Sequence, residues 1–553
     1  MRKVLTSEEM HEVDRLTTEK YGIPPILLME NAAHAAARVI SEKLGGSVDG
    51  KSFLVLCGKG NNGGDGAALA RVLWQQGADV EVCLFGLVED TKDHARVNFE
   101  ILRKITDQEG FELDQTDLAF EEITSLEEWL EYDSLNFHCD DPDVLVDALF
   151  GTGLKRALDG VYEQVAAYIS AYTAEDAGQG TFVVSLDVPS GLDSDCGERI
   201  GMNARAHVTV TFTAPKLANV IPPASNFSGE LRVENIGSPC ELINETASRV
   251  FVAEMEDACD WLTRTNFTPN SYKNKRGHAL LIAGSKNYSG AAVLCANAAI
   301  RSGVGLVTIA TPESSLLSVS SRVLPDVIVR SISQTENRTV SEDTFHEIEE
   351  YWGNVDAVAI GSGLSMAKRG ERTGDSTTPE FVRRVVENRR TPLLIDADGL
   401  NALSPFDLQG SAEMPLILTP HEGEFLRLIG TTDKDDVKDR VKAARRFAEK
   451  HCIILVLKGE RTLIVGPGGK VVINSTGNSG LGKAGNGDTL TGIITGFVAQ
   501  AVKMNVPIFE TIVAAVYIAG LAGDIAAAKY GKRIMTASDV QECLAEAFEE
   551  ILR

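Results

Sequence analysis

A glycine-rich stretch near the end of the chain, Gly477 to Leu490, carries residues suited to phosphate chemistry. Five of its residues are glycine, and the apolar run after Thr489 predicts a helix. Glycines let the backbone approach phosphate closely, and a helix N-terminus presents unpaired N–H groups and a positive dipole end. An acid in such an anion site, here Asp488, is unfavourable unless it handles a proton; a plain turn is the alternative.

The same stretch matches the spacing of a P-loop, but one residue excludes a P-loop. Gly477 to Lys483 fits the pattern, whereas Ala484 stands where a P-loop needs a hydroxyl group for Mg²⁺. Gly485-Asn486-Gly487-Asp488 suits another kind of phosphoryl transfer. In it, backbone N–H groups stabilise the moving charge and the Asp takes the proton of an attacking hydroxyl.

A second Gly-rich loop, Gly58 to Gly66, lies between a predicted buried strand over Phe53–Cys57 and a predicted helix through Gln76. Its G-x-G-x-x-G spacing is a weak sign of dinucleotide binding, because the next predicted strand, Asp79–Phe85, is not followed by the acid that would hold a ribose. Its two Asn residues and its Asp also offer oxygen ligands to a hard cation. A structural turn is the alternative.

Two further strands of the first half carry an Asp at or near their ends. Asp147 lies in the run Val144–Leu154, and Asp187 follows Val183–Leu186; another strand is predicted over His207–Thr213. Open α/β sheets bind ligands at the carboxyl ends of their strands. One such Asp could cap a helix, but two beside the Asn-containing loop indicate a site.

The second half repeats the pattern of strands that end in polar residues. Asp396 and Asp398 follow one predicted strand, His421 follows the next, and Lys458 ends a third. Taken singly, His421 could be a helix cap and Lys458 a solvated strand end. Alternating strands and helices predict an α/β fold with mostly parallel sheets between helix layers.

Composition limits the class of protein. The chain has 553 residues, a formal charge of −26 and 44% hydrophobic residues. These values predict two to four domains with substantial cores, and they argue against nucleic acid or an anionic membrane as the main partner. Nine cysteines without a CxxC pair indicate neither a disulfide framework nor a zinc site. We expect a cytoplasmic, reduced protein that forms a homo-oligomer.

Three stretches bear on the organisation of the chain. Ser7–Leu16 predicts a helix with Ser7 as its N-cap, and the acid-rich stretch Glu89–Asp143 predicts surface helices and loops. The N-terminus lacks an apolar signal segment, and Thr511–Gly523 predicts a buried helix that is too short for a bilayer. The periodicity lapses after Ile236, so we predict domains over 1–240 and 273–553 with a connection over 241–272 and a boundary near Pro239–Val250.

The motifs of the first half resemble those of NAD(P)H-hydrate epimerase domains. The matching pieces are Gly58–Gly66, Val146–Gly153 and Asp187–Gly191. The resemblance implies a Rossmann-like α/β domain that binds the hydrated nicotinamide and a potassium ion. It assigns the ion to Asn62, Asp147 and Ser190, and the hydrate to Asn61, Asn62, Gly63, Gly64, Asp65, Gly151, Thr152, Gly153, Leu154, Lys155, Arg156, Ala157, Tyr162 and Asp187. Epimerisation needs ring opening or proton exchange, which makes Asp187 the candidate catalytic residue.

The motifs of the second half resemble the ribokinase-like superfamily and, more closely, its nucleotide-dependent NAD(P)H-hydrate dehydratases. The matching pieces are Gly284-Ser285 with Tyr288–Ala291, Gly361–Gly363, Asp396–Asp398, Thr419–Glu424, Lys458-Gly459 and Gly485–Asp488. The resemblance assigns the hydrate to Ala291, Gly363, His421 and Asp488. It assigns the adenine nucleotide to Lys458, Gly459, Glu460, Arg461, Thr462, Asn478, Ser479, Gly480, Leu481, Gly482, Lys483, Ala484, Gly485, Asn486 and Gly487; Asn486 departs from the small residue that is frequent at its position.

Together the two resemblances imply repair of hydrated NADH and NADPH. The first domain would interconvert the R and S hydrates, and the second would phosphorylate the ring hydroxyl of the S form with Mg²⁺ and ADP or ATP, then eliminate phosphate. One alternative is a vitamin kinase of the hydroxyethylthiazole or pyridoxal type. Another is a non-catalytic N-terminal binding module, which the retained oxygen ligands Asn62, Asp147 and Ser190 disfavour.

Overall fold

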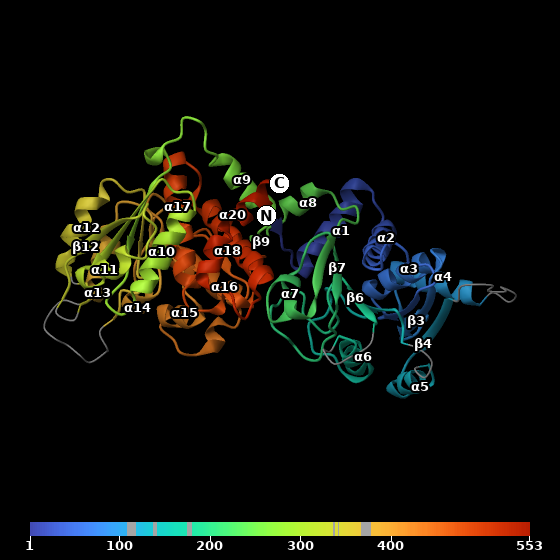
Figure 1. Cartoon of the computed structure of the whole chain (residues 1–553). Coiled ribbons are helices and arrows are strands. Elements are labelled where there is room, and N and C mark those ends of the chain that lie inside the picture. Colours follow the sequence, from blue (N-terminus) through green and yellow to red (C-terminus); the bar gives the residue numbers. More distant parts are fainter. Residues whose placement is uncertain (108–117, 137–140, 174–179, 336–337, 341, 367–377) are drawn as a thin grey trace. The chain divides into compact units, whose positions relative to one another are not determined.

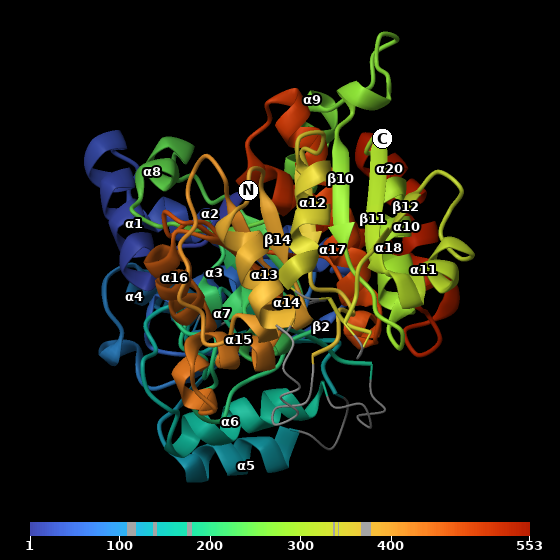
Figure 2. The same cartoon turned by 90° about the vertical axis from the view of Figure 1, so that its left-hand side faces the viewer.

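The computed structural model describes residues 1–107, 118–136, 141–173, 180–335, 338–340, 342–366 and 378–553. It contains two compact units (Figures 1 and 2): Lys3–Ser248, and Arg249–Arg553 together with Met1–Arg2. The division at Ser248 lies inside the Pro239–Val250 stretch. The predicted connection, 241–272, includes most of helix α8 and all of strand β9 and helix α9.

The N-terminal unit is built on a parallel sheet with an order typical of doubly wound folds. Within the described residues it has seven strands, and each adjacent pair runs parallel. The order reverses between β2 and β5, which is the point where such sheets bind ligands. From edge to edge the strands are β4 (Leu118–Ile123), β3 (Asp79–Phe85), β2 (Ser52–Cys57), β5 (Val144–Ala148), β6 (Phe182–Leu186), β7 (Val208–Phe212) and β8 (Glu230–Glu234).

Helices cover both faces of this sheet, because alternate strand residues point to opposite sides. Val55 and Cys57 of β2 belong to the core shared with α2, α3 and α4, whereas Leu54 and Leu56 belong to the core shared with α5 and α6. The predicted three-layer α/β/α arrangement is confirmed. The helices are α1 (Ser7–Tyr21), α2 (Pro25–Lys43), α3 (Asn61–Gln75), α4 (Asp93–Thr106), α5 (Leu126–Asn136), α6 (Gly160–Ala171), α7 (Leu217–Val220) and α8 (Cys240–Glu245).

The first helix begins as predicted, but its N-cap was assigned to the wrong residue. Thr6, not Ser7, caps α1: the Thr6 hydroxyl accepts a hydrogen bond from the Glu9 backbone N–H, and the Glu9 carboxylate accepts one from the Thr6 N–H. Ser7 is instead hydrogen-bonded to Asp195 through both its backbone N–H and its hydroxyl. This long-range contact was not visible in the sequence.

The C-terminal unit has a larger, mostly parallel sheet. Within the described part of the chain its eleven strands run in the order β1 (Arg2–Lys3), β9 (Val250–Val252), β18 (Val471–Ile473), β17 (Leu463–Val465), β16 (Ile454–Leu457), β15 (Leu416–Leu418), β14 (Leu393–Ile395), β13 (Ala357–Ile360), β10 (His278–Ile282), β11 (Leu306–Pro312) and β12 (Ile328–Ile332). Strand β17 runs antiparallel to both β16 and β18. The strand order reverses between β13 and β10.

The helices of this unit are α9 (Met255–Arg264), α10 (Ser289–Arg301), α11 (Glu313–Ser320), α12 (Phe345–Trp352), α13 (Thr378–Glu387), α14 (Asp398–Ala402), α15 (Glu422–Ile429), α16 (Arg440–His451), α17 (Asn486–Met504), α18 (Ile508–Tyr530), α19 (Ala537–Glu542) and α20 (Leu544–Leu552). Helix α17 packs closely on α10, because a side chain at Gly492 would lie 2.1 Å from the Cys295 carbonyl oxygen. Helix α18 is apolar and long enough to cross a bilayer, but 78% of its most apolar stretch is buried. It is the buried helix predicted around Thr511–Gly523, but the prediction that it is too short for a bilayer was wrong, because the helix extends beyond the apolar run at both ends.

The acid-rich stretch Glu89–Asp143 contains more regular structure than predicted. Besides helices α4 and α5 it supplies β4, which pairs in parallel with β3 along its whole length. Exposed residues alternate with less exposed ones along this edge strand, which explains why the sequence predicts a surface segment there. Residues 108–117 and 137–140 of the stretch lie outside the described residues.

Candidate active sites

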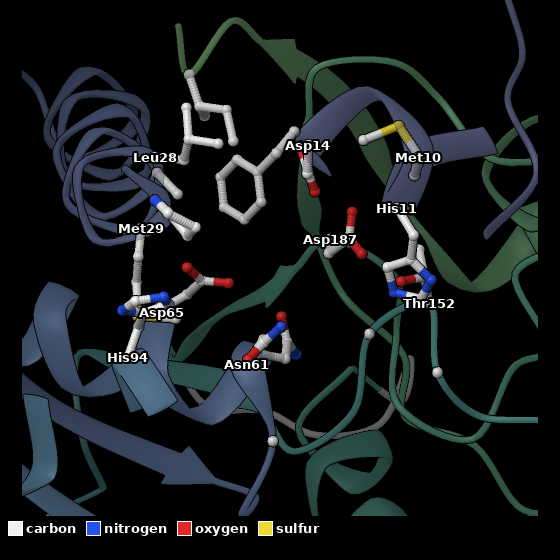
Figure 3. A pocket seen from close by; sticks show the side chains of 18 of the residues that line it. Met10, His11, Asp14, Leu28, Met29, Asn61, Asp65, His94, Thr152 and Asp187 are labelled. Atoms are coloured by element: carbon white, nitrogen blue, oxygen red, sulfur yellow. The ribbon is translucent and has the colours of Figure 1, made fainter. Parts of the chain in front are cut away.

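The N-terminal unit holds a cavity of about 620 Å³ at the strand-order reversal. The loop after β2 and the loop after β5 form one side of it, and Asp187 after β6 and Phe212 at the end of β7 lie on another. Helices α1 and α2 complete the wall (Figure 3). The volume falls in the range typical of small-molecule and cofactor sites.

The Gly58–Gly66 loop requires glycine for close backbone approach. A side chain at Gly58 would lie 2.0 Å from the Leu149 carbonyl oxygen, and one at Gly63 would lie 1.7 Å from the Gly58 carbonyl oxygen. Helix α3 starts at Asn61, and within the described residues its N-cap, Gly60, makes no side-chain capping hydrogen bond. The first N–H groups of α3 therefore face the cavity as an anion-binding end.

Asn62 is buried and its side-chain amide has no hydrogen-bond partner among the described residues, at either the oxygen or the nitrogen. A buried amide without partners is unfavourable, which indicates that a ligand completes it. A side chain at Gly151 would lie 3.4 Å from the Asn62 Oδ1 and 3.0 Å from an Asp187 carboxylate oxygen, so these two groups flank the same loop.

Asp147 is fully buried and well satisfied. Its carboxylate accepts hydrogen bonds from the Ser185 hydroxyl (2.9 Å), the Ser190 backbone N–H (2.8 Å) and the Ser190 hydroxyl (2.5 Å). The Ser190 Oγ in turn accepts a hydrogen bond from the Phe150 N–H, next to Gly151. Burial raises the pKa of Asp147, and these donors oppose that shift. The network therefore links Asp147 and Ser190 to the loop beside Asn62.

Asp187 forms a buried ion pair with Lys216, a residue that sequence reasoning missed. The Lys216 side chain is 1% exposed, and its Nζ also donates to the Thr211 hydroxyl (2.9 Å) and the Phe212 carbonyl oxygen (3.0 Å). Asp187 has a φ of 64°, a left-handed conformation that is strained for a residue other than glycine. The fold thus fixes the Asp187 carboxyl group at the cavity wall against a buried cation. No sequence motif marks Lys216, since its partner lies 29 positions away.

Two more carboxyl groups line the cavity near Asp187 (Figure 3). Burial raises the pKa of Asp14 to about 6; Lys216 lowers it and Asp187 raises it. Burial and the neighbouring Asp187 and Asp14 also raise the pKa of Asp65 well above its ordinary value. The carboxyl groups of Asp14, Asp65 and Asp187 thus all interact electrostatically with one buried cation, Lys216.

The structure brings only part of the predicted hydrate-binding set to the cavity. Asn61, Asn62, Asp65, Gly151, Thr152, Gly153, Leu154 and Asp187 line it, whereas Gly63, Gly64, Lys155, Arg156, Ala157 and Tyr162 do not. Gly64 packs against Ala95, and the Tyr162 hydroxyl donates to the Phe85 carbonyl oxygen. All remain predictions as substrate contacts.

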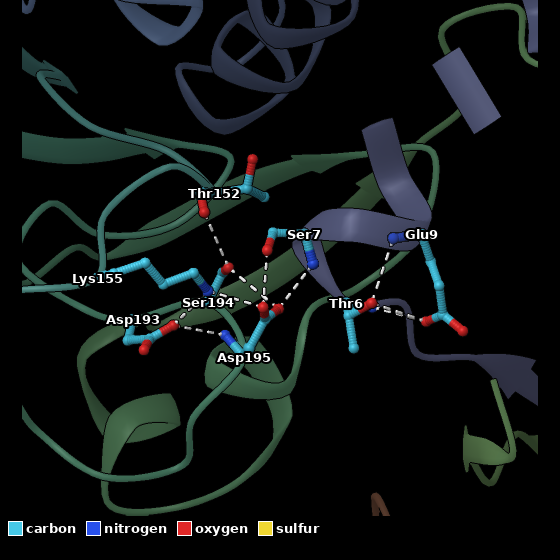
Figure 4. A network of polar contacts seen from close by, with 8 residues as sticks. All are labelled: Thr6, Ser7, Glu9, Thr152, Lys155, Asp193, Ser194 and Asp195. Carbon is cyan, nitrogen blue, oxygen red and sulfur yellow. Dashed lines mark hydrogen bonds and ion pairs between the residues drawn. The ribbon is translucent and has the colours of Figure 1, made fainter. Parts of the chain in front are cut away.

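Lys155 belongs to a polar network with Ser7, Asp193, Ser194 and Asp195 (Figure 4). Its Nζ contacts Asp193 (2.8 Å) and Asp195 (2.7 Å), and Asp195 accepts hydrogen bonds from Ser7 at the start of α1 (2.7 Å). The Ser194 hydroxyl donates to the Thr152 carbonyl oxygen. The network therefore ties helix α1 to the loop after β5.

In the C-terminal unit the predicted catalytic Asp488 lies in the first turn of α17. Gly485, its N-cap, has a φ of 93°, and no side chain among the described residues caps the helix. Burial and the nearby Asp396 raise the pKa of Asp488 to about 6, while Ser362 and Lys458 lower it. The turn therefore combines free N–H groups with a carboxyl that can exchange a proton near neutral pH.

Asp396 organises this site from the end of β14. Its buried carboxylate contacts the Lys458 Nζ (2.8 Å), the Thr419 hydroxyl (2.8 Å) and the Thr491 hydroxyl (2.9 Å). Thr419 and Lys458 directly follow β15 and β16, and Thr491 belongs to α17, so one carboxylate joins the ends of two strands to a helix. Lys458 lies next to the helix turn, since a side chain at Gly487 would come within 3.5 Å of its Nζ.

The other predicted hydrate contacts lie on neighbouring elements. A side chain at Gly363 would lie 2.9 Å from the Ala291 Cβ, so these two residues are adjacent. His421 is the N-cap of α15: its Nδ1 accepts hydrogen bonds from the Gly423 and Glu424 N–H groups. The capping alternative for His421 is thus correct, and its Nε2 lies 3.6 Å from the Glu424 carboxylate.

The predicted nucleotide-binding loops are held by residues outside them. Asp524 of α18, another residue that the sequence analysis missed, accepts hydrogen bonds from the Gly477 N–H and the Asn478 side chain. Lys483 donates to the backbone carbonyl oxygens of Arg533 and Met535, and Arg461 donates to that of Ser475. Asn478 and Lys483 thus shape the loop by contacts within the protein. In the described residues no group of three acidic, His or Cys side chains forms a metal site.

Both halves of the chain match known protein families. Residues 279–546 match the family model described as NAD(P)H-hydrate dehydratase, and residues 26–218 match the model described as YjeF-related protein N-terminus. The chain is 36% identical to the bifunctional NAD(P)H-hydrate repair enzyme Nnr of Moorella thermoacetica, over 98% of this chain and 96% of the relative. The protein of the same name from Thermofilum pendens is 34% identical over 99% and 97%.

Solved structures resemble about half of the chain. The ADP/ATP-dependent NAD(P)H-hydrate dehydratase of Bacillus subtilis, co-crystallised with ATP and Mg²⁺, is 29% identical with a TM-score of 0.45 and covers 55% of this chain and 100% of its own. A hydroxyethylthiazole kinase of Pyrococcus horikoshii is 14% identical with a TM-score of 0.33 and covers 53% and 93%.

Proposed function

The chain belongs to the family of bifunctional NAD(P)H-hydrate repair enzymes, and we propose that its two sites divide the repair between them. Residues 1–240 interconvert the R and S hydrates of NADH and NADPH, and residues 273–553 dehydrate the S form with ADP or ATP. The observation that carries the second assignment is Asp488, a carboxyl with a pKa of about 6 beside the free N–H groups of α17.

Dehydration uses Asp488 as a general base. The carboxylate takes the proton of the ring hydroxyl, whose oxygen then bonds to the terminal phosphorus of the nucleotide while the bond to the leaving nucleotide oxygen breaks. The Gly485–Gly487 N–H groups stabilise charge on the transferred group. Phosphate leaves more readily than hydroxide, so it departs with the C–O electron pair, and loss of a proton from the adjacent carbon restores the dihydronicotinamide ring.

Mg²⁺ enters this site with the nucleotide. The described residues form no preorganised cage for a metal, and Mg²⁺ ordinarily keeps several waters and binds through one or two carboxylates plus substrate phosphates. Asp398 at the N-terminus of α14, whose pKa burial raises, is the carboxyl best placed to contribute. When bound, the ion neutralises phosphate charge.

The experiment that tests the dehydratase assignment is turnover of the pure S hydrate of NADH, with ADP and with ATP in separate reactions. We expect the absorbance of NADH to appear and inorganic phosphate to be released in equal amounts with at least one donor. Accumulation of a stable phosphorylated product without NADH would indicate a small-molecule kinase instead. No turnover with either donor would contradict the assignment.

Asp187 is the proposed base of the epimerase site. Lys216 and Thr211 hold one of its oxygens, and its other oxygen lies beside Gly151 at the cavity. The start of α3 would hold the pyrophosphate of the dinucleotide. A carboxylate next to a cavity of this size can take a proton from water or from the substrate hydroxyl.

A potassium ion fits the Asn62 side of this cavity, and we include it in the proposal. The buried Asn62 oxygen lacks a partner among the described residues, and Asp147 and Ser190 adjoin the same loop through Phe150. Amide, carboxylate and hydroxyl oxygens suit a hard cation. When bound, the ion would fix the loops around the substrate. Thermal unfolding in KCl against NaCl tests this: equal midpoints would contradict a potassium site.

A further inference from the structure

We propose that Asp14, on helix α1, is the proton donor that works opposite Asp187 in the epimerase site. The inference rests on the proposed epimerase function and adds a residue from outside the matched segment 26–218. Helix α1 supplies Met10, His11, Asp14, Arg15 and Thr18 to the cavity wall. With Glu19, helix α1 lines the cavity with six residues, against four from the Gly58–Gly66 loop.

The placement of Asp14 is the first support. Asp14 lines the cavity, and Figure 3 shows its carboxyl group directed into the same hollow as those of Asp65 and Asp187. Its Oδ1 is buried and has no hydrogen-bond partner within the described part of the chain. Buried carboxyl oxygens are normally paired, so this one is left available to a ligand.

Asp14 and Asp187 differ in their charged partners, and this difference indicates different roles. Asp187 has a direct ion pair with the buried Lys216, whereas Asp14 forms no ion pair with any described residue and has only a longer-range interaction with that cation. Burial raises the pKa of Asp14 to about 6, so a protonated fraction exists near neutral pH. Two carboxyl groups in such different surroundings, one paired with a cation and one not, are the pattern of a base and an acid in one site.

The other charged groups around Asp14 do not replace this role. His11 and Arg15 lie on the same helix, and Arg15 is paired with Glu12 and Glu19. Across the cavity, burial raises the pKa of Asp65 well above its ordinary value. Helix α8, which packs on α1, carries Glu241 and Glu245, and both are exposed. Lys216 is the cation that acts on Asp14 most strongly.

Helix α1 is anchored so that Asp14 keeps its position. Asp195 receives the Ser7 N–H and hydroxyl at the start of α1, and Lys155 links Asp195 to the loop that lines the cavity (Figure 4). The capping box of Thr6 and Glu9 fixes the same turn. A helix held at its N-terminus by two independent contacts presents Asp14 at a constant place.

The proposed reaction balances without another reactant. The hydrated carbon carries its hydroxyl next to the ring nitrogen. Asp14 gives a proton to that hydroxyl, the C–O bond breaks with its electron pair going to oxygen, and water leaves while the nitrogen lone pair forms a C=N⁺ bond. Water then adds from the other face and gives a proton to Asp187. The net change is inversion, and solvent returns the proton from Asp187 to Asp14.

The test compares Asp14→Asn, Asp14→Glu and the control Glu8→Gln in the full-length protein. Glu8 lies on the exposed side of the same helix. Each variant receives pure R hydrate without nucleotide, chromatography follows the S hydrate, and the uncatalysed rate is subtracted. We expect Asp14→Asn to lower kcat/KM by about 100-fold or more, the effect of losing a general acid, and Glu8→Gln to match the wild type.

The pH profile separates a proton donor from a merely structural residue. In the wild type, kcat/KM should fall as pH rises through about 6, because the protonated Asp14 is then lost. Asp14→Asn should remove that fall, and Asp14→Glu should keep it at a reduced rate. A wild-type rate in Asp14→Asn, or a reduced rate with the fall still present, overturns the inference.

Folding provides an independent readout of the same variants. The Asp14 carboxyl titrates near 3.9 when unfolded and near 6 when folded, so its ionisation costs stability as pH rises through this window and the full cost persists above pH 6. Asp14→Asn should therefore unfold at an equal or higher temperature at pH 8 than the wild type.

If Asp14→Asn fails to fold, the inference is tested with Asp14→Glu instead. A pH profile of Asp14→Glu in which kcat/KM no longer falls as pH rises overturns the inference. A wild type that epimerises neither hydrate refutes the proposed function instead.

Discussion

Replacing Asp488 with asparagine should lower the dehydration rate of the S hydrate by about 10²–10⁴-fold, the usual contribution of a general base. Asparagine has nearly the same shape as aspartate but cannot accept the proton of the substrate hydroxyl. The pH profile should change with it. In the wild type the base form is lost below a pKa of about 6, so kcat/KM should fall tenfold per pH unit below that value. The variant should show no such inflection.

Two controls accompany this measurement. Glu550→Gln removes an exposed carboxylate from α20 in the same unit and should leave the rate unchanged. Fluorescence titration with nucleotide should show that Asp488→Asn still binds it, because Lys458 and its partner Asp396 remain. An Asp488→Asn variant that retains the wild-type rate and pH profile would show that another group is the base.

Replacing Lys216 with methionine should destabilise the N-terminal unit by about 3–5 kcal/mol, the cost of removing one partner of a buried ion pair. Methionine fills a similar volume, but Asp187 would keep a buried charge with the Thr211 hydroxyl as its remaining side-chain donor in the described residues. Epimerase activity should fall as well, since the carboxylate loses the cation that orients it. Denaturant unfolding of the full chain measures the loss.

A matched surface variant distinguishes this effect from a general loss of charge. Lys155 contacts two carboxylates but is 49% exposed, so Lys155→Met should cost no more than about 1 kcal/mol. The double variant Lys216→Met with Asp187→Asn removes both charges and should recover part of the stability without the activity. Turnover of the S hydrate should persist in all three, because that site lies in the other unit. A Lys216→Met midpoint equal to that of the wild type would refute the buried-pair account.

Much of the fold could be predicted from the sequence, because buried parallel strands appear in it as short apolar runs. Strand β3 was predicted with its observed bounds, and the strand ends that carry Asp187, Asp396 and Lys458 were located correctly. The family predicted from the motifs is confirmed, and so is the mostly parallel α/β class. Strand β4 was missed because its alternating exposed residues resemble the surface helices around it.

In the candidate sites, only the residues that belong to local sequence motifs could be predicted. Gly-rich loops and strand-end acids have spacing that the chain itself displays. Lys216, Asp14 and Asp524 act through partners far along the chain, and their types are common everywhere. The Ser7 N-cap assignment was wrong for the same reason, since Asp195 lies 188 residues away. Long-range pairing requires the folded structure.

The most direct test of the central claim is repair of the pure R hydrate by two single-site variants mixed together. The wild type should convert R hydrate to NADH when nucleotide is present. Asp187→Ala and Asp488→Asn should each fail alone, the first by leaving R hydrate and the second by accumulating S hydrate. Their mixture should restore NADH formation, because each variant retains the site that the other lacks. Two results would contradict the proposed division of the repair between the two sites. One is that Asp187→Ala alone turns over R hydrate at the wild-type rate. The other is that the mixture stays inactive although Asp187→Ala dehydrates S hydrate normally.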